Sequence, residues 1–156
     1  MKKVIVLLIT HMMVAAMGFA GGIYILPVLI DAPAPTQETM ATAKTQSEYE
    51  GEFVKSLKDS DFLHWGEGRV LVGQQQIALE GKLAPGPDYK LYLSTKFIET
   101  EAEFLKNKSE MVQVADIKTF TNFVVPVPST VDVSSYSTVI IWCEAFSQFI
   151  TAASYK

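Results

Sequence analysis

Two side chains outside the apolar N-terminal stretch could carry redox or ligand chemistry, namely Cys143 and His64. Cys143 is the single cysteine of the 156-residue chain, so this chain alone has no disulfide, no CxxC redox pair and no thiolate set for zinc or an iron–sulfur cluster. A thiol needs a second thiol, a metal or a haem to cycle reversibly as an electron carrier. We therefore expect the chain to bind no cofactor alone and a partner to supply any haem or metal.

The surroundings of Cys143 in the sequence allow two interpretations. In a β-strand, Val139, Ile141 and Cys143 share one face, and Ile140 and Trp142 share the other. A thiol aligned with Val and Ile is typical of a small buried hydrophobic residue, whereas a reactive thiol needs partial exposure and a nearby cation or helix N-terminus. Core packing and a redox site both remain open at this point.

Metal and hydrolase chemistry have little support. A blue-copper site uses two histidines and a cysteine, but His64 is the only histidine outside the apolar stretch. Cys143, His64 and Met111 could supply three ligands, yet they are widely separated in the sequence. The hydrolase motifs GxSxG and HExxH are absent. The sequence therefore does not predict a stand-alone catalytic activity.

Residues 4–30 contain no Asp, Glu, Lys or Arg. Roughly 20 apolar residues suffice to cross a bilayer as a helix, so this run predicts a transmembrane anchor with room for tilt. The alternative is a cleaved signal peptide, with Gly18 and Ala20 at the cleavage spacing. Cleavage there would leave an uncharged, apolar tail in water, which favours the uncleaved anchor.

The orientation of the anchor follows from its flanking charges. Lys2 and Lys3 precede the apolar run, and no basic residue follows it until Lys44. By the positive-inside rule, residues 1–3 are expected in the cytoplasm and the C-terminal part outside it, periplasmic or extracellular, in a single-pass protein of the cell membrane. The Gly18 and Gly22 pair has GxxxG spacing that suits a homodimer, although small residues are also simply common in transmembrane helices.

Residues 31–48 are rich in Ala, Pro and small polar residues, so we expect an extended linker with too little apolar content to pack. Residues 49–156 form the expected folded domain. The formal net charge of −4 and the lack of Lys and Arg clusters argue against nucleic acid as a partner.

The expected domain consists of short strands separated by turns, with one short helix over residues 99–106. Alternating or β-branched runs predict strands over residues 69–72, 76–79, 90–94, 112–114, 122–127 and 138–144. Pro126 and Pro128 lack a ladder donor and must lie at a sheet edge or a strand end. Spacing of about ten residues between strands predicts an all-β fold of about 100 residues, an antiparallel β-sandwich or open barrel preceded by one transmembrane helix.

Several stretches of this domain resemble the DM-thirteen family, known as an electron-transfer domain. They are Gly51-x-Phe53 followed by His64, LAPGPDYKLYLS over residues 83–94, the Asp116-Ile117-Lys118 turn, the Val125-Pro126 strand end, and SSYSTVIIWCEAFSQFITAASY over residues 134–155. One departure is the segment KTFTNF, residues 118–123, where the family tends to have a Gly-rich stretch.

The resemblance implies a small extracytoplasmic all-β unit, found in some proteins beside DOMON and cytochrome b modules, in which the cysteine is proposed to be redox active. The expected function is thus a membrane-anchored redox or electron-transfer accessory with Cys143, together with His64, at its site and a redox or haem-bearing envelope protein as its partner. The alternative is a non-catalytic envelope binding or assembly module in which Cys143 is only packed in the core.

Overall fold

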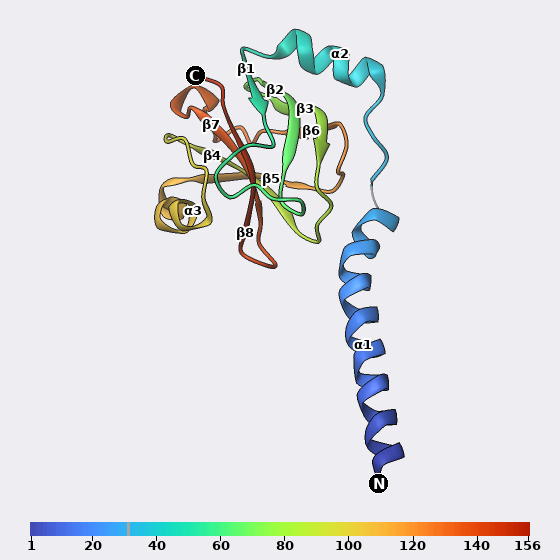
Figure 1. Ribbon diagram of the computed structural model, residues 1–156. Coiled ribbons are helices and arrows are strands. Elements are labelled where there is room, and N and C mark those ends of the chain that lie inside the picture. Colours follow the sequence, from blue (N-terminus) through green and yellow to red (C-terminus); the bar gives the residue numbers. More distant parts are fainter. Residues whose placement is uncertain (31) are drawn as a thin grey trace.

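The computed structural model describes residues 1–30 and 32–156. A long N-terminal helix, α1 (Lys2–Leu29), projects from a β-rich domain, and a second helix, α2 (Gln37–Gln46), precedes the first strand (Figure 1). The strands are β1 (Tyr49–Phe53), β2 (Gly66–Val72), β3 (Gln76–Leu83), β4 (Tyr89–Ser94), β5 (Val112–Ile117), β6 (Phe123–Pro126), β7 (Thr138–Cys143) and β8 (Gln148–Ser154), with α3 (Glu101–Asn107) between β4 and β5.

The described strands form two antiparallel four-stranded sheets. The first has the order β1-β2-β3-β6 and the second the order β5-β4-β7-β8. Their inner faces enclose one core of aliphatic and aromatic side chains, to which Val70 and Leu79 of the first sheet and Leu91 and Ile141 of the second contribute. The predicted β-sandwich is confirmed, because side chains of both sheets meet in a single hydrophobic layer.

The strand predictions hold best where the residue pattern is strongest. Pro126 is the last residue of β6, and β6 is an edge strand, as the missing N–H of proline requires. Strands β1 and β8 were not predicted, because YEGEF and QFITAAS carry few β-branched residues. Gly51 of β1 has a packing reason, since a Cβ there would lie 2.7 Å from the carbonyl oxygen of Ser154 in β8.

The expectation of an extended linker that cannot pack is wrong for its second half. Residues Gln37–Gln46 form α2, which begins at Thr36, whose hydroxyl accepts a hydrogen bond from the N–H of Thr39. Met40 and Ala43 of α2 are buried against Leu71 and Ala78 on the outer face of the first sheet. Two apolar residues suffice because they cover a small patch that the strands leave open. Asp31, the first residue of the expected linker, lies outside the described residues.

The outer face of the second sheet is covered by the predicted short helix, α3. Phe104 of α3 stacks on Trp142 of β7, with ring centroids 3.9 Å apart, and contacts the ring of Tyr92 edge-on. Beside these rings the Tyr92 hydroxyl donates a hydrogen bond to Glu144, which also accepts from the Lys108 ammonium at 2.7 Å. The alternation of β7 thus places Trp142 under α3 and its neighbour Cys143 in the core between the sheets.

Helix α1 contains a stretch, Lys2–Ile23, that is long and apolar enough to cross a membrane. Among the described residues, the most apolar part of this stretch has no buried side chain, unlike a core helix, and only its last residue, Ile23, lines a hollow together with the domain. A signal sequence near an N-terminus has the same length and composition. Ala32, three residues after the end of α1, donates a hydrogen bond from its N–H to the carbonyl oxygen of Lys118, at 3.1 Å.

Candidate functional site

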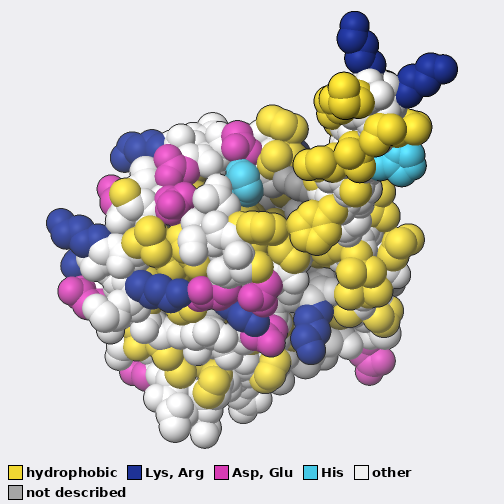
Figure 2. Space-filling view, turned by 90° about the horizontal axis from the view of Figure 1, so that it is seen from below, with side chains coloured by type: hydrophobic (Ala, Val, Ile, Leu, Met, Phe, Trp, Pro, Cys, Tyr) yellow, Lys and Arg dark blue, Asp and Glu magenta, His cyan; other side chains and the backbone are white. Residues whose placement is uncertain are grey.

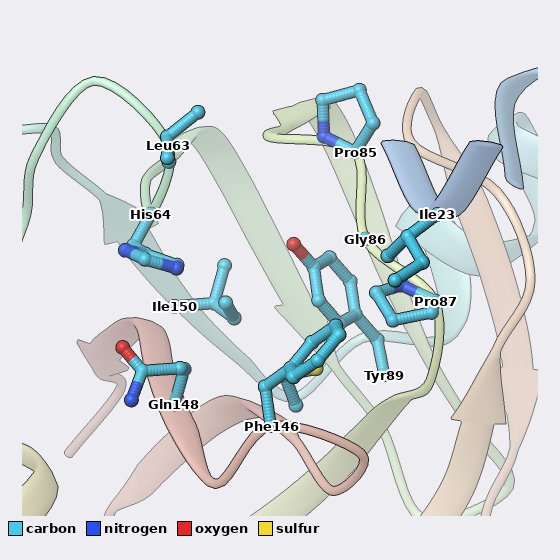
Figure 3. A pocket seen from close by; sticks show the side chains of 11 residues that line it. Ile23, Leu63, His64, Pro85, Gly86, Pro87, Tyr89, Phe146, Gln148 and Ile150 are labelled. Carbon is cyan, nitrogen blue, oxygen red and sulfur yellow. The ribbon is translucent and has the colours of Figure 1, made fainter. Parts of the chain in front are cut away.

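Cys143 and His64, the two residues singled out in the sequence, line the same small pocket at one end of the sandwich. The pocket has a volume of about 40 Å³, which is room for a few water molecules. Figure 3 shows His64 on one side of it and Tyr89, Pro87 and Phe146 on the other. The fold therefore brings together two side chains that lie far apart in the sequence.

Cys143 is the last residue of β7 and is directly paired with Tyr89 of β4. Its side chain belongs to the core between the sheets, as the strand alternation predicts, and only 2% of it is exposed. Burial raises the pKa of the thiol, and this effect outweighs the opposite influence of the backbone at Phe146, Asp88 and Ala145. The thiol is therefore protonated at neutral pH.

His64 lies in the loop between β1 and β2 and is fixed by Asp61. The carboxylate of Asp61 accepts hydrogen bonds from the backbone N–H groups of Leu63 and His64, both at 2.7 Å, and lies 3.0 Å from Nδ1 of His64. Partial burial tends to raise the pKa of Asp61, but the hydrogen bonds from His64 and Leu63 outweigh it and lower that pKa below the ordinary value. An ionised Asp61 favours the proton on Nδ1, which leaves Nε2 as the acceptor nitrogen.

The imidazole of His64 separates two hollows. On one side it lines the pocket that contains Cys143, and on the other it lines an open polar depression together with Asp61, Lys58 and Glu101. His64 thus lines both the pocket of Cys143 and a water-exposed depression.

Tyr89, Phe146 and Gln148 complete the pocket and were not identified in the sequence. In Figure 3 the hydroxyl of Tyr89 points to the side on which His64 lies. The Tyr89 ring packs edge-on against Phe120, with centroids 5.9 Å apart and an interplanar angle of 87°. Phe120 belongs to residues 118–123, the segment that differs from the DM-thirteen pattern. This segment therefore contacts a residue of the site directly. The alternation of residues 90–94 predicted the strand β4. It did not indicate that Tyr89, the first residue of this strand, would pair with Cys143.

Met111 does not join Cys143 and His64. It packs against the cluster under α3, on the opposite side of the second sheet from the thiol. In the part of the chain that the structure describes, no three His, Cys, Asp or Glu side chains gather as a metal site. One thiol and one imidazole do not match the ligand set of a blue-copper centre, and we derive no step through a metal or haem held by this chain.

Comparison with known proteins gives one match. The family model described as Electron transfer DM13 matches residues 52–155, which include His64, Tyr89 and Cys143. No curated protein and no solved structure matches this chain.

Proposed function

Because the chain belongs to the Electron transfer DM13 family, we propose that it is a membrane-anchored electron-transfer accessory whose site is the pocket of Cys143, His64 and Tyr89. The observation that carries the proposal is the convergence of Cys143 and His64 on one pocket. The thiol comes from the end of β7 and the imidazole from the loop before β2, where Asp61 holds the imidazole.

The chemistry open to this pocket is proton-coupled chemistry at sulfur. A thiolate, and not a thiol, is the nucleophile and the metal ligand, so the proton on Cys143 must leave before the sulfur can act. His64 is suited to receive it at Nε2, because Asp61 holds Nδ1. The polar depression on the far side of the ring gives that proton a route to water.

The electron acceptor or donor in this proposal is a haem or metal centre of a partner protein at the cell envelope. A partner is supported by the small number of metal-binding groups in the pocket, which are one sulfur and one imidazole. We further infer that α1 remains in the membrane with residues 1–3 in the cytoplasm, and that the β-domain lies outside it. Lys2 and Lys3 before the apolar stretch support this orientation.

A second candidate function has its own observation. Cys143 is almost fully buried and its pKa is raised, as expected of a thiol that only fills the core. In that case the domain would be a non-catalytic binding or assembly module of the envelope, and the pocket would have no redox role.

Thiol alkylation of the full chain in detergent separates the two functions, since Cys143 is the single cysteine. The rate of reaction with iodoacetamide is measured across a pH series, in native buffer and in urea. For a redox site we expect a slow but measurable reaction of the native chain. Its rate should continue to increase at pH values above the ordinary thiol pKa of about 8.5. At neutral pH the rate should be lower in His64→Gln. The matched control is His11→Gln, which changes the histidine of the apolar helix and should leave the rate unaltered.

A native thiol that reacts only after unfolding, at the same rate in both histidine variants, would favour the packed cysteine and the binding module. The absorption spectrum adds an independent test of the partner-held cofactor. The purified chain is expected to show no visible band, and a band that disappears in Cys143→Ser would show instead that this chain holds its own chromophore.

A further inference from the structure

An apolar groove runs between the end of α1 and the β-domain. It has a volume of about 470 Å³. Its apolar lining includes Ile23, Leu26 and Ile30 from the helix end and Pro87, Phe120 and Phe146 from the domain. Figure 2 shows hydrophobic side chains continuing from the helix onto the neighbouring surface of the domain, with charged side chains farther along that face.

The groove is open, and several of its apolar side chains are accessible. Leu26 is 56% exposed, Ile30 is 70% exposed and Phe146 is 52% exposed. Contiguous apolar surface of this kind marks contact with a membrane or with another protein, because leaving it in water is unfavourable. The identity of the occupant therefore has to come from where the groove lies.

The position of the groove along α1 points to lipid. With residues 1–3 in the cytoplasm, residues 4–23 of the apolar stretch Lys2–Ile23 extend roughly 30 Å at 1.5 Å per residue, which matches the hydrocarbon core of a bilayer. Ile23 then lies at the boundary of that core, and the groove begins at the same residue. The hydrogen bond between Ala32 and Lys118 keeps the domain close to the helix end, so the groove cannot lie far above the interface.

The charges around the groove fit the headgroup region of a neutral bilayer. Lys90 is paired with both Asp88 and Asp116, at 2.8 and 3.0 Å, so these three side chains leave a single net negative charge. Lys118 is exposed at the edge of the groove, at a level where an ammonium group can reach lipid phosphates. The acidic balance of the whole chain offers no attraction to anionic lipid, so apolar contact is the expected driving force.

We propose that bilayer lipid fills this groove and that the loop between β7 and β8, which contains Phe146, rests in the membrane interface. The inference rests on the proposed anchoring of α1. The groove and the Cys143 pocket share Ile23, Pro87, Tyr89 and Phe146, so the site opens beside the bilayer surface. A redox partner therefore reaches Cys143 along the membrane and not from the bulk solution.

Spin labelling of the full chain in phosphatidylcholine vesicles tests this placement. In a Cys143→Ser background, one nitroxide is attached at Phe146→Cys, at Val14→Cys in the apolar helix, or at Thr130→Cys. Strand β3 has the pocket near its C-terminal end. Its first residue, Gln76, pairs with Pro126 at the end of β6, and Thr130 follows β6. Thr130 is therefore the control at the far end of the sandwich.

Oxygen concentrates in lipid, whereas a nickel chelate stays in water. The labels at Phe146 and Val14 are therefore expected to collide several-fold more often with oxygen than with the nickel chelate. The label at Thr130 is expected to collide more often with the nickel chelate. A lipid-exposed Val14 with a water-exposed Phe146 would overturn the docking and leave the anchor standing. Water exposure at both would show that the anchoring itself is wrong. Dipolar broadening between Phe146 labels would assign the groove to a second copy of the chain.

A second measurement avoids the cysteine background. Phe146→Trp in the otherwise native chain is compared with Thr130→Trp in vesicles that contain brominated lipid. Lipid in the groove predicts several-fold stronger quenching of the new tryptophan at Phe146 than at Thr130, and equal quenching at the two positions would contradict it.

Discussion

Tyr89 of β4 is the direct cross-strand partner of Cys143 of β7, and both side chains face the core between the two sheets. The pairing sets a phenol ring beside the thiol at the end of the sandwich that opens onto the pocket. Gly86 and Phe120 hold the ring in place, the first by leaving room for it and the second by an edge-on contact. The exposure of Cys143 therefore depends on the position of Tyr89.

Gly86→Ala should make Cys143 more reactive. A methyl group at residue 86 would overlap the Tyr89 ring, and Phe120 blocks an easy retreat, so the ring must shift. Overpacking of this kind costs about 1–3 kcal/mol of unfolding free energy, measured by urea denaturation. The alkylation rate of Cys143 should rise at the same time. Gly22→Ala is the control, because a Cβ there meets nothing within 4 Å, and an equal rate in the two variants would show that Tyr89 does not shield the thiol.

Met40→Ala should destabilise the domain although Met40 precedes the sandwich. Its side chain is only 8% exposed and packs with Ala43 against the outer face of the first sheet. Truncating a buried Met to Ala usually lowers the free energy of unfolding by about 2 kcal/mol or more. We expect a loss at the low end of this range, because Met40 packs on the outside of the sandwich. Met40→Leu should cost less than about 1.5 kcal/mol, since it keeps the volume. Equal urea midpoints for Met40→Ala and the native chain would mean that α2 adds nothing to stability.

The stability of the domain should fall as the pH rises above about 10, the ordinary pKa of tyrosine. Burial, followed by the influence of Tyr49, Tyr136 and Asp132, raises the pKa of Tyr155. A group whose pKa is higher in the folded chain stabilises the fold below its unfolded pKa, and this contribution is lost with rising pH. Unfolding free energies from urea titrations over an alkaline pH series measure the loss.

Tyr155→Phe should reduce this alkaline loss and lower stability at neutral pH. The Tyr155 hydroxyl donates a buried hydrogen bond of 2.8 Å to the carbonyl oxygen of Val133, and an unpaired carbonyl costs about 1–3 kcal/mol. Tyr136→Phe is the comparison variant, because it removes one influence on the pKa of Tyr155 but keeps the hydrogen bond to Val133, so it should reduce the alkaline loss less than Tyr155→Phe does. A Tyr155→Phe variant with the native pH dependence would show that Tyr155 is not the group responsible.

The double change Gly18→Ile and Gly22→Ile should abolish a homodimer of α1 without affecting the fold. Side chains at both positions would meet open space in the single chain, so unfolding of the β-domain should be unchanged. Helices that approach through small residues would be forced apart. Chemical cross-linking in vesicles measures the dimer, with Gly21→Ile as the control. Cross-linking that persists in the double variant would exclude the face of Gly18 and Gly22.

Local patterns were sufficient for much of the fold. The alternation of Val139, Ile141 and Cys143 predicted which face of β7 meets the core, and Pro126 predicted an edge strand, because side-chain direction and missing donors are properties of the residues themselves. Helix α2 escaped prediction because Met40 and Ala43 are apolar enough to pack only when Leu71 and Ala78 are already in place. Strand β8 escaped it because burial by the other sheet, and not its own composition, makes QFITAAS a strand.

The sequence by itself determined that this chain has one thiol, one histidine outside its apolar helix and an all-β domain resembling an electron-transfer family. Only the tertiary structure decided that Cys143 and His64 share a pocket, that Met111 does not, and that Tyr89 and Phe146 complete it. The reason is that composition and periodicity act over a few residues, whereas a pocket is formed by side chains from separate strands and loops. Their meeting depends on sheet order and register, which are settled by the packing of the whole sandwich.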